Sequence, residues 1–335
     1  MPFTRFLSLA LLAICLQFHP VQSAAQDDFL SPSWSSVTVG VADLDQALEF
    51  WVGTLGFSQL ASAEGDDPEL ATLWRLLPED IKRQALLGMP GSTQGRLHLV
   101  EFSEPGPAVR EGTKAYDAGP QSLVVYAQDL PARVKEMQEA GFTFFSAEPY
   151  EVSQADGLQL SEIRLGIHDE VSLILRELHG AELVTNARGF SGIMALVNVV
   201  EFAQAERDFL SQQMGLGLLA ERSIEGIELE YLMGLPSGAL LETSSWGAAT
   251  DVPGQLQLDD FRHASPGANL YPVAVPTQLG ILHVTYAATA IEVLQQKLHA
   301  GGYNFNDREF REVIYGSGRF IRFRTPAGMN IEAFQ

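Results

Sequence analysis

The sequence has 335 residues, of which 46% are hydrophobic and 19% charged, so it is long enough for two domains with sizeable cores and is not of the disordered type. Its formal net charge of −21 argues against nucleic acid or an anionic membrane as a partner, because both are bound by clustered Lys and Arg.

The first element along the chain is a stretch of the secretory-signal type. Arg5 supplies a positive charge, residues 6–18 form an apolar run, and residues 23–25 are small enough for cleavage. The run is shorter than the roughly 20 residues of a spanning helix, so we expect no stable membrane insertion after cleavage. We predict a signal peptide over residues 1–25 and a periplasmic or secreted protein; an uncleaved anchor is the alternative. The one cysteine, Cys15, lies inside this stretch, which leaves the mature chain without disulfides or thiol chemistry.

A repeat organises the rest of the chain. Residues 37–64 resemble residues 195–222, and residues 123–145 resemble residues 283–305, at a nearly constant offset of about 160 residues. Each copy has the pattern of a β-branched strand, a turn, an amphipathic helix and a glycine before a second strand. Duplication of a two-module unit leaves such an offset.

Further strands with period-two alternation follow each helix. Four repeats of strand, helix and strand meander predict an α+β fold built from four βαβββ modules. Residues 180–190 carry the change from the second module to the third, so we predict consecutive domains over residues 34–180 and 190–335. Residues 64–93 and 247–279 are rich in Gly, Pro and Asp and are predicted to be insertions that cover or frame a site.

Two stretches, SSVTVGVADLDQALEFWVGTLGF at residues 35–57 and RTPAGMNIEAF at residues 324–334, resemble the vicinal oxygen chelate superfamily of glyoxalases, bleomycin-resistance proteins and extradiol dioxygenases. The resemblance covers nearly all of residues 34–335 and points to a fold rather than to one reaction. It implies that each pair of modules curls its sheet into a half-open cup. It also implies that a divalent metal can sit in a cup, held by residues from the first and last strands of each module.

In the first pair of modules, the positions implied by the resemblance hold poor metal ligands. The first strands offer Ser36 and Ser122, and the last strands offer Glu101 and either Leu175 or Glu177. Transition metals prefer imidazoles or several carboxylates. We therefore expect no metal in the N-terminal domain.

Two histidines of the first pair, His98 and His168, lie near these positions in the sequence but not on them. A histidine at a strand edge is more often a surface residue or a hydrogen-bonded core residue than a ligand. Neither is predicted to belong to a site.

The second pair offers a better set, with Met194 and His283 in the first strands and Glu242 and Glu332 in the last strands. Alternation leaves His283 and Glu332 on the open face of the sheet. One imidazole and two carboxylates can bind Fe(II), Mn(II), Zn(II) or Ni(II) and leave positions for water and substrate. Met194 is a poor ligand for such ions, so the resemblance implies three protein ligands, His283, Glu242 and Glu332.

Further side chains are predicted to line the same C-terminal cup. Arg322 or Arg324 can hold a substrate carboxylate, Tyr315 adds an aromatic surface, and Met194 contacts the substrate. The alternative for the arginine is a cross-strand pair with a surface acid.

Two functions stay open at this point. The first is an exported, metal-dependent lyase or isomerase acting on a small oxygen-rich molecule, with Glu332 as ligand or base; a dioxygenase is less favoured because one histidine is present instead of two. The second is a metal-free binding protein of the bleomycin-resistance type with a hydrophobic ligand. In either case one pair of modules can be purely structural. We expect no nucleotide cofactor, since no phosphate-binding glycine pattern is present, and the cups can form within one chain or across a homodimer.

Overall fold

The computed structural model describes residues 29–153, 159–225, 235, 237–262, 267–312 and 314–335. The predicted signal peptide over residues 1–25 lies outside these residues and stays a prediction. In the described part of the chain, no helix is both long enough and apolar enough to cross a membrane.

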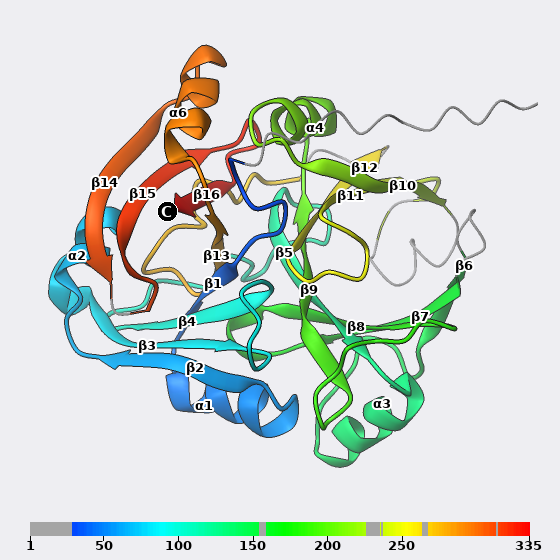
Figure 1. The fold of residues 1–335 in the computed structure, drawn as a ribbon. Coiled ribbons are helices and arrows are strands. Elements are labelled where there is room, and N and C mark those ends of the chain that lie inside the picture. Colours follow the sequence, from blue (N-terminus) through cyan, green and yellow to red (C-terminus); the bar gives the residue numbers. More distant parts are fainter. Residues whose placement is uncertain (1–28, 154–158, 226–234, 236, 263–266, 313) are drawn as a thin grey trace, which may run out of the picture.

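Four modules follow one another, each with one strand, one main helix and three further strands, which confirms the predicted α+β fold (Figure 1). The first module contains β1 (Ser36–Val41), α1 (Leu44–Leu48), β2 (Ser58–Glu64), an additional helix α2 (Pro68–Trp74), β3 (Ile81–Gly88) and β4 (Arg96–Phe102). The second contains β5 (Gly119–Ala127), α3 (Leu130–Glu139), β6 (Tyr150–Ser153), β7 (Gln159–Gly166) and β8 (Ser172–Leu178). The third contains β9 (Phe190–Val199), α4 (Ala203–Gln212), β10 (Gly217–Glu225), β11 (Leu240–Gly247) and β12 (Gln255–Arg262). The fourth contains β13 (Gly280–Ala287), α6 (Ile291–Ala300), β14 (Phe305–Glu312), β15 (Gly316–Arg324) and β16 (Asn330–Phe334).

The modules do not pair in sequence order. One eight-stranded sheet has the order β14-β15-β16-β13-β1-β4-β3-β2 and joins the fourth module to the first. The other has the order β10-β11-β12-β9-β5-β8-β7-β6 and joins the third module to the second. We call the hollow of the first sheet the first cup and that of the second sheet the second cup. The prediction that residues 34–180 and 190–335 each form a cup of their own is therefore wrong, because each sheet takes one module from each range.

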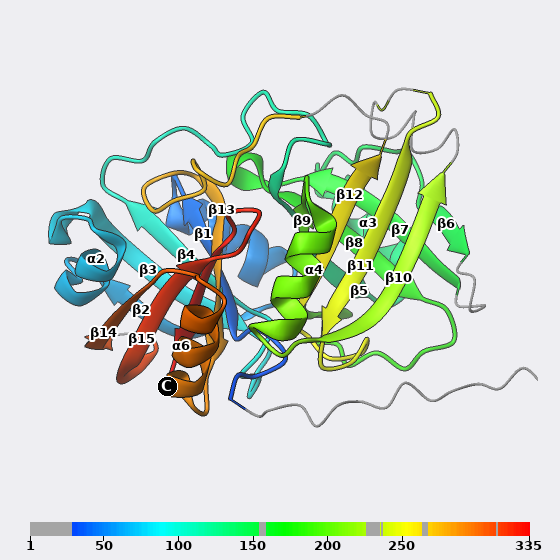
Figure 2. The same cartoon turned by 90° about the horizontal axis from the view of Figure 1, so that it is seen from above.

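The connections between modules explain this pairing. Modules two and three are joined by the short segment 179–189, and they share a sheet. The segments that leave module one and enter module four run side by side, with bridges from Ala108 to Leu279 and from Ala118 to Asn269 (Figure 2). The chain thus crosses from the first sheet to the second and returns. Because the four modules resemble one another, their similarity alone cannot indicate which first strands pair.

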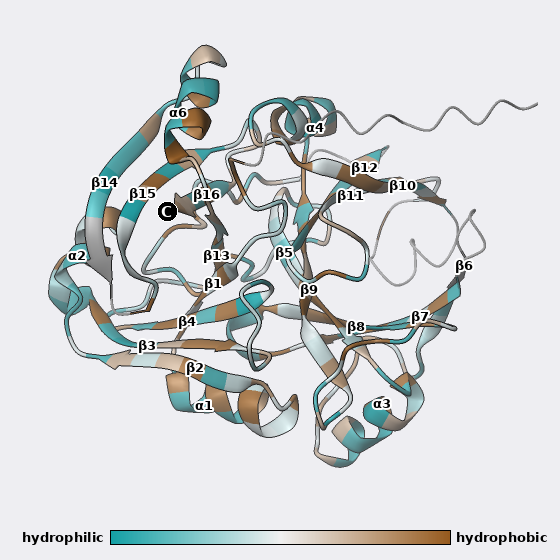
Figure 3. Cartoon of the chain, viewed as in Figure 1, coloured by the Kyte–Doolittle hydropathy of each residue, from teal (hydrophilic) through white to brown (hydrophobic). Residues whose placement is uncertain are grey.

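One apolar core lies between the two sheets and their helices. Alternation directs Val37, Val39 and Val41 of β1 into this core, and α1, α3, α4 and α6 pack their buried residues against it. The switching of hydrophobic and hydrophilic residues along the strands can be followed in Figure 3. Trp34 is fully buried and donates its ring N–H to the carbonyl of Gln255 at 2.8 Å, which ties one sheet to the other. The opposite face of each sheet is left to line a cup.

The two predicted insertions contain regular elements. Residues 64–93 hold α2 and β3, and residues 247–279 hold β12, the last strand of the third module. The sequence of β12 includes Asp259 and Asp260, and aspartate is depleted in strands. The local composition therefore did not indicate β12, because its two aspartates are typical of a loop.

Glu206 of α4 is fully buried and ties the third module to the fourth. Its Oε2 accepts the backbone N–H of Ala327 at 2.9 Å, in the turn before β16. Burial raises the pKa of Glu206 to about 7, against the smaller opposing effects of hydrogen bonds from Thr325 and Ala327. Because this folded-state pKa lies above the unfolded value of 4.5, the stabilisation by the neutral carboxyl is complete below pH 4.5 and is lost as the pH rises through about 7.

We expect Glu206→Gln, which keeps an acceptor but cannot ionise, to match the parent at pH 4 and to exceed its free energy of unfolding at pH 8 by on the order of 3 kcal/mol. Urea titrations at both pH values measure the difference. Glu49→Gln, which removes the same charge at an exposed position after α1, is the matched control. A Glu206→Gln variant with the same advantage at both pH values would contradict this account.

Candidate functional site

The first cup brings together four of the six predicted site residues. His283 of β13 and Glu332 of β16 meet on its inner face, with 3.3 Å between Nε2 and Oε2. Arg322 of β15 lies opposite Glu332, and its Nε is 3.6 Å from Oε1. Tyr315, in the turn before β15, packs edge to face against His98 with ring centroids 5.5 Å apart.

The other two predicted residues lie in the second sheet. Glu242 of β11 forms an ion pair with Arg262 at 3.1 Å, and Met194 of β9 is buried in an apolar cluster. The predicted ligand set of His283, Glu242 and Glu332 therefore does not assemble. Two features of the fold separate it: the third and fourth modules belong to different sheets, and β12 rather than β11 is the last strand of the third module.

Trp74 was not singled out in the sequence, yet it fills the first cup. It ends α2, which begins with Pro68 after Asp67, whose side chain accepts the backbone N–H of Leu70 at 3.0 Å. In Figure 1, α2 lies between β14 and the strands β2 and β3. The Trp74 ring N–H donates to Oε1 of Glu332 at 2.9 Å. Helix α2 thereby closes the cup over its polar residues.

His98 also faces the first cup, whereas the sequence predicted no role for it. Its Nε2 hydrogen-bonds to Oε1 of Gln84 at 2.9 Å, and the Gln84 amide donates to Asp67 at 3.2 Å. The chain of contacts thus links His98 to the start of α2. Burial, together with the neighbouring His283, lowers the pKa of His98 to about 3, so the ring is neutral at ordinary pH.

Strand alternation was the signal that could have found His98. In β4, Leu97 and Leu99 face the core, so His98 between them faces the cup. The same alternation directs Glu101 away from the cup, where it pairs with Arg83 at 2.6 Å. The position implied by the resemblance was therefore assigned to the wrong face of this strand.

Glu332 is ionised inside the protein although only 2% of it is exposed. Burial by itself raises the pKa of this carboxyl. The neighbouring His283 and Arg322 and the hydrogen bond from Trp74 outweigh burial and hold the pKa of Glu332 at about 2. These three partners keep a buried carboxylate charged in the closing strand.

The residues of the first cup do not fit the divalent metal that the resemblance implies. His283 Nε2 lies 3.3 Å from Glu332 Oε2, so these two side chains together could offer two ligands to an ion. His98 faces the same cup with its Nε2 hydrogen-bonded to Gln84, and the Trp74 indole occupies the space beside Glu332. In the residues that the structure describes, no three His, Cys, Asp or Glu side chains lie close enough to share an ion. We assign no metal-dependent step to this cup.

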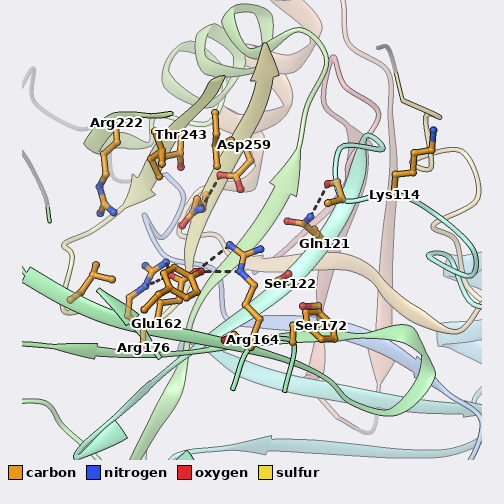
Figure 4. A pocket seen from close by; sticks show the side chains of 18 of the residues that line it. Lys114, Gln121, Ser122, Glu162, Arg164, Ser172, Arg176, Arg222, Thr243 and Asp259 are labelled. Atoms are coloured by element: carbon orange, nitrogen blue, oxygen red, sulfur yellow. Dashed lines mark hydrogen bonds and ion pairs between the residues drawn. The ribbon is translucent and has the colours of Figure 1, made fainter. Parts of the chain in front are cut away.

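The second cup holds a cavity of about 580 Å³ (Figure 4). Its polar lining follows from strand alternation: along β7, Ile163 and Leu165 face the core, while Glu162 and Arg164 face the cavity. A strand of this kind, apolar on one face and charged on the other in a buried sheet, is the sequence signal for the cavity.

Two arginines share one carboxylate at the floor of this cavity. Arg176 binds Oε2 of Glu162 through Nε and Nη2 at 3.1 and 2.6 Å, and Arg164 lies 3.2 Å from Oε1. The Tyr150 hydroxyl donates to the same Oε1 at 2.6 Å. Burial by itself raises the pKa of Glu162, but the two guanidinium charges hold it at about 2. The buried group therefore carries one net positive charge.

Three cavity-lining side chains have a buried atom without a hydrogen-bond partner: Gln121 Oε1, Ser122 Oγ and Asp259 Oδ2. At most 6% of each residue is exposed. Burial raises the pKa of Asp259, whose other oxygen accepts a hydrogen bond from Gln257 at 2.8 Å. A buried polar atom left unpaired costs about 1–3 kcal/mol, so these three atoms call for a polar occupant.

The remaining sequence positions fall into ordinary roles. Ser122 faces the second cup, whereas Leu175 packs in the core and Glu177 accepts backbone N–H groups at the start of α3. His168 accepts the ring N–H of Trp51 at 2.8 Å. Of these, only Ser122 contributes to a candidate site.

We expect Trp74→Phe to lower the free energy of unfolding at pH 7 by about 1.5–3 kcal/mol, because the ionised Glu332 loses a hydrogen-bond donor. Trp246→Phe is the matched control, since its ring N–H donates to the neutral Ser244 hydroxyl at 3.0 Å, and it should cost only about 0.5–1.5 kcal/mol. Urea titration of both variants makes the comparison. Equal losses would show that the Trp74–Glu332 contact has no special role.

Comparison with known proteins identifies solved structures with a similar fold. No protein-family model and no curated protein matches the sequence. Among solved structures, glyoxalase I from Zea mays is similar over 90% of this chain and 92% of its own, at 13% identity and a TM-score of 0.59, and a single-residue variant of that enzyme gives 0.60 at 14% identity. A dioxygenase candidate from Bacillus subtilis is similar over 91% of this chain and 85% of its own, at 16% identity and a TM-score of 0.57. Such identities show the fold alone: the chain has the duplicated, glyoxalase-like fold of the vicinal oxygen chelate type.

Proposed function

We propose that this protein binds a small, oxygen-rich organic molecule in the second cup. One observation carries the proposal: a cavity of about 580 Å³ whose lining includes three buried polar atoms without a hydrogen-bond partner. Ligand pockets in proteins are typically about 300–1,000 Å³ with a few fixed polar groups. The arrangement therefore has both the size and the polar groups of a ligand site.

The second cup does not match the site expected for either of the two functions that the sequence left open. The described lining holds arginines, carboxylates, hydroxyls and amides but no histidine, so it suits a polar ligand rather than the hydrophobic one expected of a bleomycin-resistance type. The metal-dependent lyase or isomerase function would need a third ligand beside His283 and Glu332. We assign the first cup a structural role, with Trp74 and Glu332 closing it. Export and a homodimer stay predictions from the sequence.

Occlusion of the cavity tests the proposal. Ser172 of β8 is half-buried, lies beside Ser122 and lines the cavity, so Ser172→Phe should fill part of the space. Ligands found in a thermal-shift screen of small polar metabolites should bind Ser172→Phe at least about tenfold more weakly, and Ser172→Ala about as well as the parent. Trp74→Phe, in the other cup, should leave binding unchanged. Binding that is absent throughout the screen, or indifferent to Ser172→Phe, would contradict the proposal.

The metal content of the protein is a separate prediction. Purified without chelator or affinity tag, the parent should hold far less than one equivalent of Fe, Mn, Zn or Ni, because in the described residues no three His, Cys, Asp or Glu side chains are close enough to share an ion. Elemental mass spectrometry measures this, with His283→Ala and Glu332→Ala as controls. One equivalent in the parent that both variants lose would restore the lyase or isomerase function in the first cup.

A further inference from the structure

The charge of the second cup selects among oxygen-rich ligands. At its floor, one carboxylate serves two guanidinium groups, and the side chains of Arg164 and Arg176 are only 17% and 10% exposed. The rim carries the exposed acids Glu151, Glu170 and Glu225 and also the bases Lys114 and Arg222, so charges of both signs occur there and are screened by water and salt. Burial raises the pKa of Asp259, the other carboxyl near Arg164, which favours its neutral form. With Asp259 neutral, one guanidinium charge is left unbalanced by Glu162, and one negative charge on a ligand would balance it.

Arg164 is the residue placed to receive this charge. Its contacts with Glu162 use Nε and Nη2, and a guanidinium has further N–H groups on Nη1. Figure 4 shows Arg164 reaching from β7 into the cavity toward Asp259, with Gln121 and Ser122 to one side. A carboxylate in this space would accept charge-assisted hydrogen bonds.

The three unpartnered atoms near Arg164 can all form hydrogen bonds with hydroxyl groups of a ligand. Gln121 Oε1 can only accept a hydrogen bond, Ser122 Oγ can donate or accept, and Asp259 Oδ2 accepts when ionised and donates when protonated. An apolar ligand would bury all three unpaired, at about 1–3 kcal/mol each. A ligand with several hydroxyls pairs with each of them.

The cavity also has an apolar wall. Leu160 and Leu241 line it, and Phe145, 63% exposed, presents its ring to the same space. A chain or ring of carbons with hydroxyls on one side has a C–H face that can pack on such a surface. Charge, hydroxyl partners and an apolar face occur together in sugar acids.

We infer that the second cup binds a hydroxylated organic monoanion of sugar size, a sugar acid, with its carboxylate at Arg164 and its hydroxyls at Gln121, Ser122 and Asp259. The inference rests on the proposed binding function and narrows it. A dianion such as a sugar phosphate is disfavoured, because its second negative charge would lie near the carboxylate of Glu162.

Calorimetric titration with four probes tests the class: glucuronate, glucose, hexanoate and glucose 6-phosphate. Glucuronate should bind at least about tenfold more tightly than each of the others. Glucose lacks the charge, hexanoate lacks the hydroxyls, and glucose 6-phosphate carries a second charge. Glucose that binds as well as glucuronate would overturn the anionic part. Hexanoate that binds as well would overturn the hydroxylated part.

Two variants locate the contacts. Arg164→Met leaves Glu162 paired with Arg176 and Tyr150, and it should weaken glucuronate about 10- to 100-fold. Arg83→Met, outside both cups, changes the net charge equally and should leave binding unchanged. Gln121→Leu should weaken glucuronate without weakening hexanoate, which keeps the test decisive if Arg164→Met is unstable. Weakening by Arg83→Met as large as that by Arg164→Met would overturn the assignment.

The titrations can refute the sugar-acid inference without refuting the proposed binding function. If no probe binds, the sugar-acid inference fails. The proposed function then still stands if another small polar molecule from the screen binds the parent and is lost in Ser172→Phe. If no molecule does so, both fail.

Discussion

The antiparallel pairing of first strands is the constraint on which the rest of the structure depends. β1 pairs with β13, and β5 pairs with β9, at the centre of each sheet. This pairing decides which modules share a cup and hence which side chains can meet. His283 reaches Glu332 within its own module, but both face Thr38 and His98 of the first module rather than residues of the third. Which polar residues form a site together is therefore decided by which strands pair.

The two cups share a backbone plan and differ in what fills them. In the first, α2 inserts Trp74, and the buried carboxylate of Glu332 is stabilised by His283, Arg322 and the indole N–H. In the second, the buried ions pair with one another along β7 and β8 and leave the space above them open. A buried ion pair adds little net stability, but removing one partner is costly, so such groups hold local geometry in place. One cup is thereby a packed core, and the other keeps a cavity.

Several features were predictable from local pattern. Repeats and alternation revealed four βαβββ modules, and the same alternation placed His283 and Glu332 on a common inner face. His98 was available to that reasoning, because the leucines on either side of it mark its face. β12 was not, since Asp259 and Asp260 carry the composition of a turn. In the structure Asp259 accepts a hydrogen bond from Gln257 and Asp260 pairs with Arg262, both on the same strand.

The sequence by itself determined the module, because the periods of strands and helices are set by near neighbours along the chain. It also determined which residues face inward within each strand. Only the tertiary structure decided that module one joins module four, that Glu242 and Met194 leave the predicted site, and that Trp74 closes one cup while Arg164 lines the other. These are contacts between residues far apart in sequence, and their free energies depend on burial and charge in three dimensions, which no local period records.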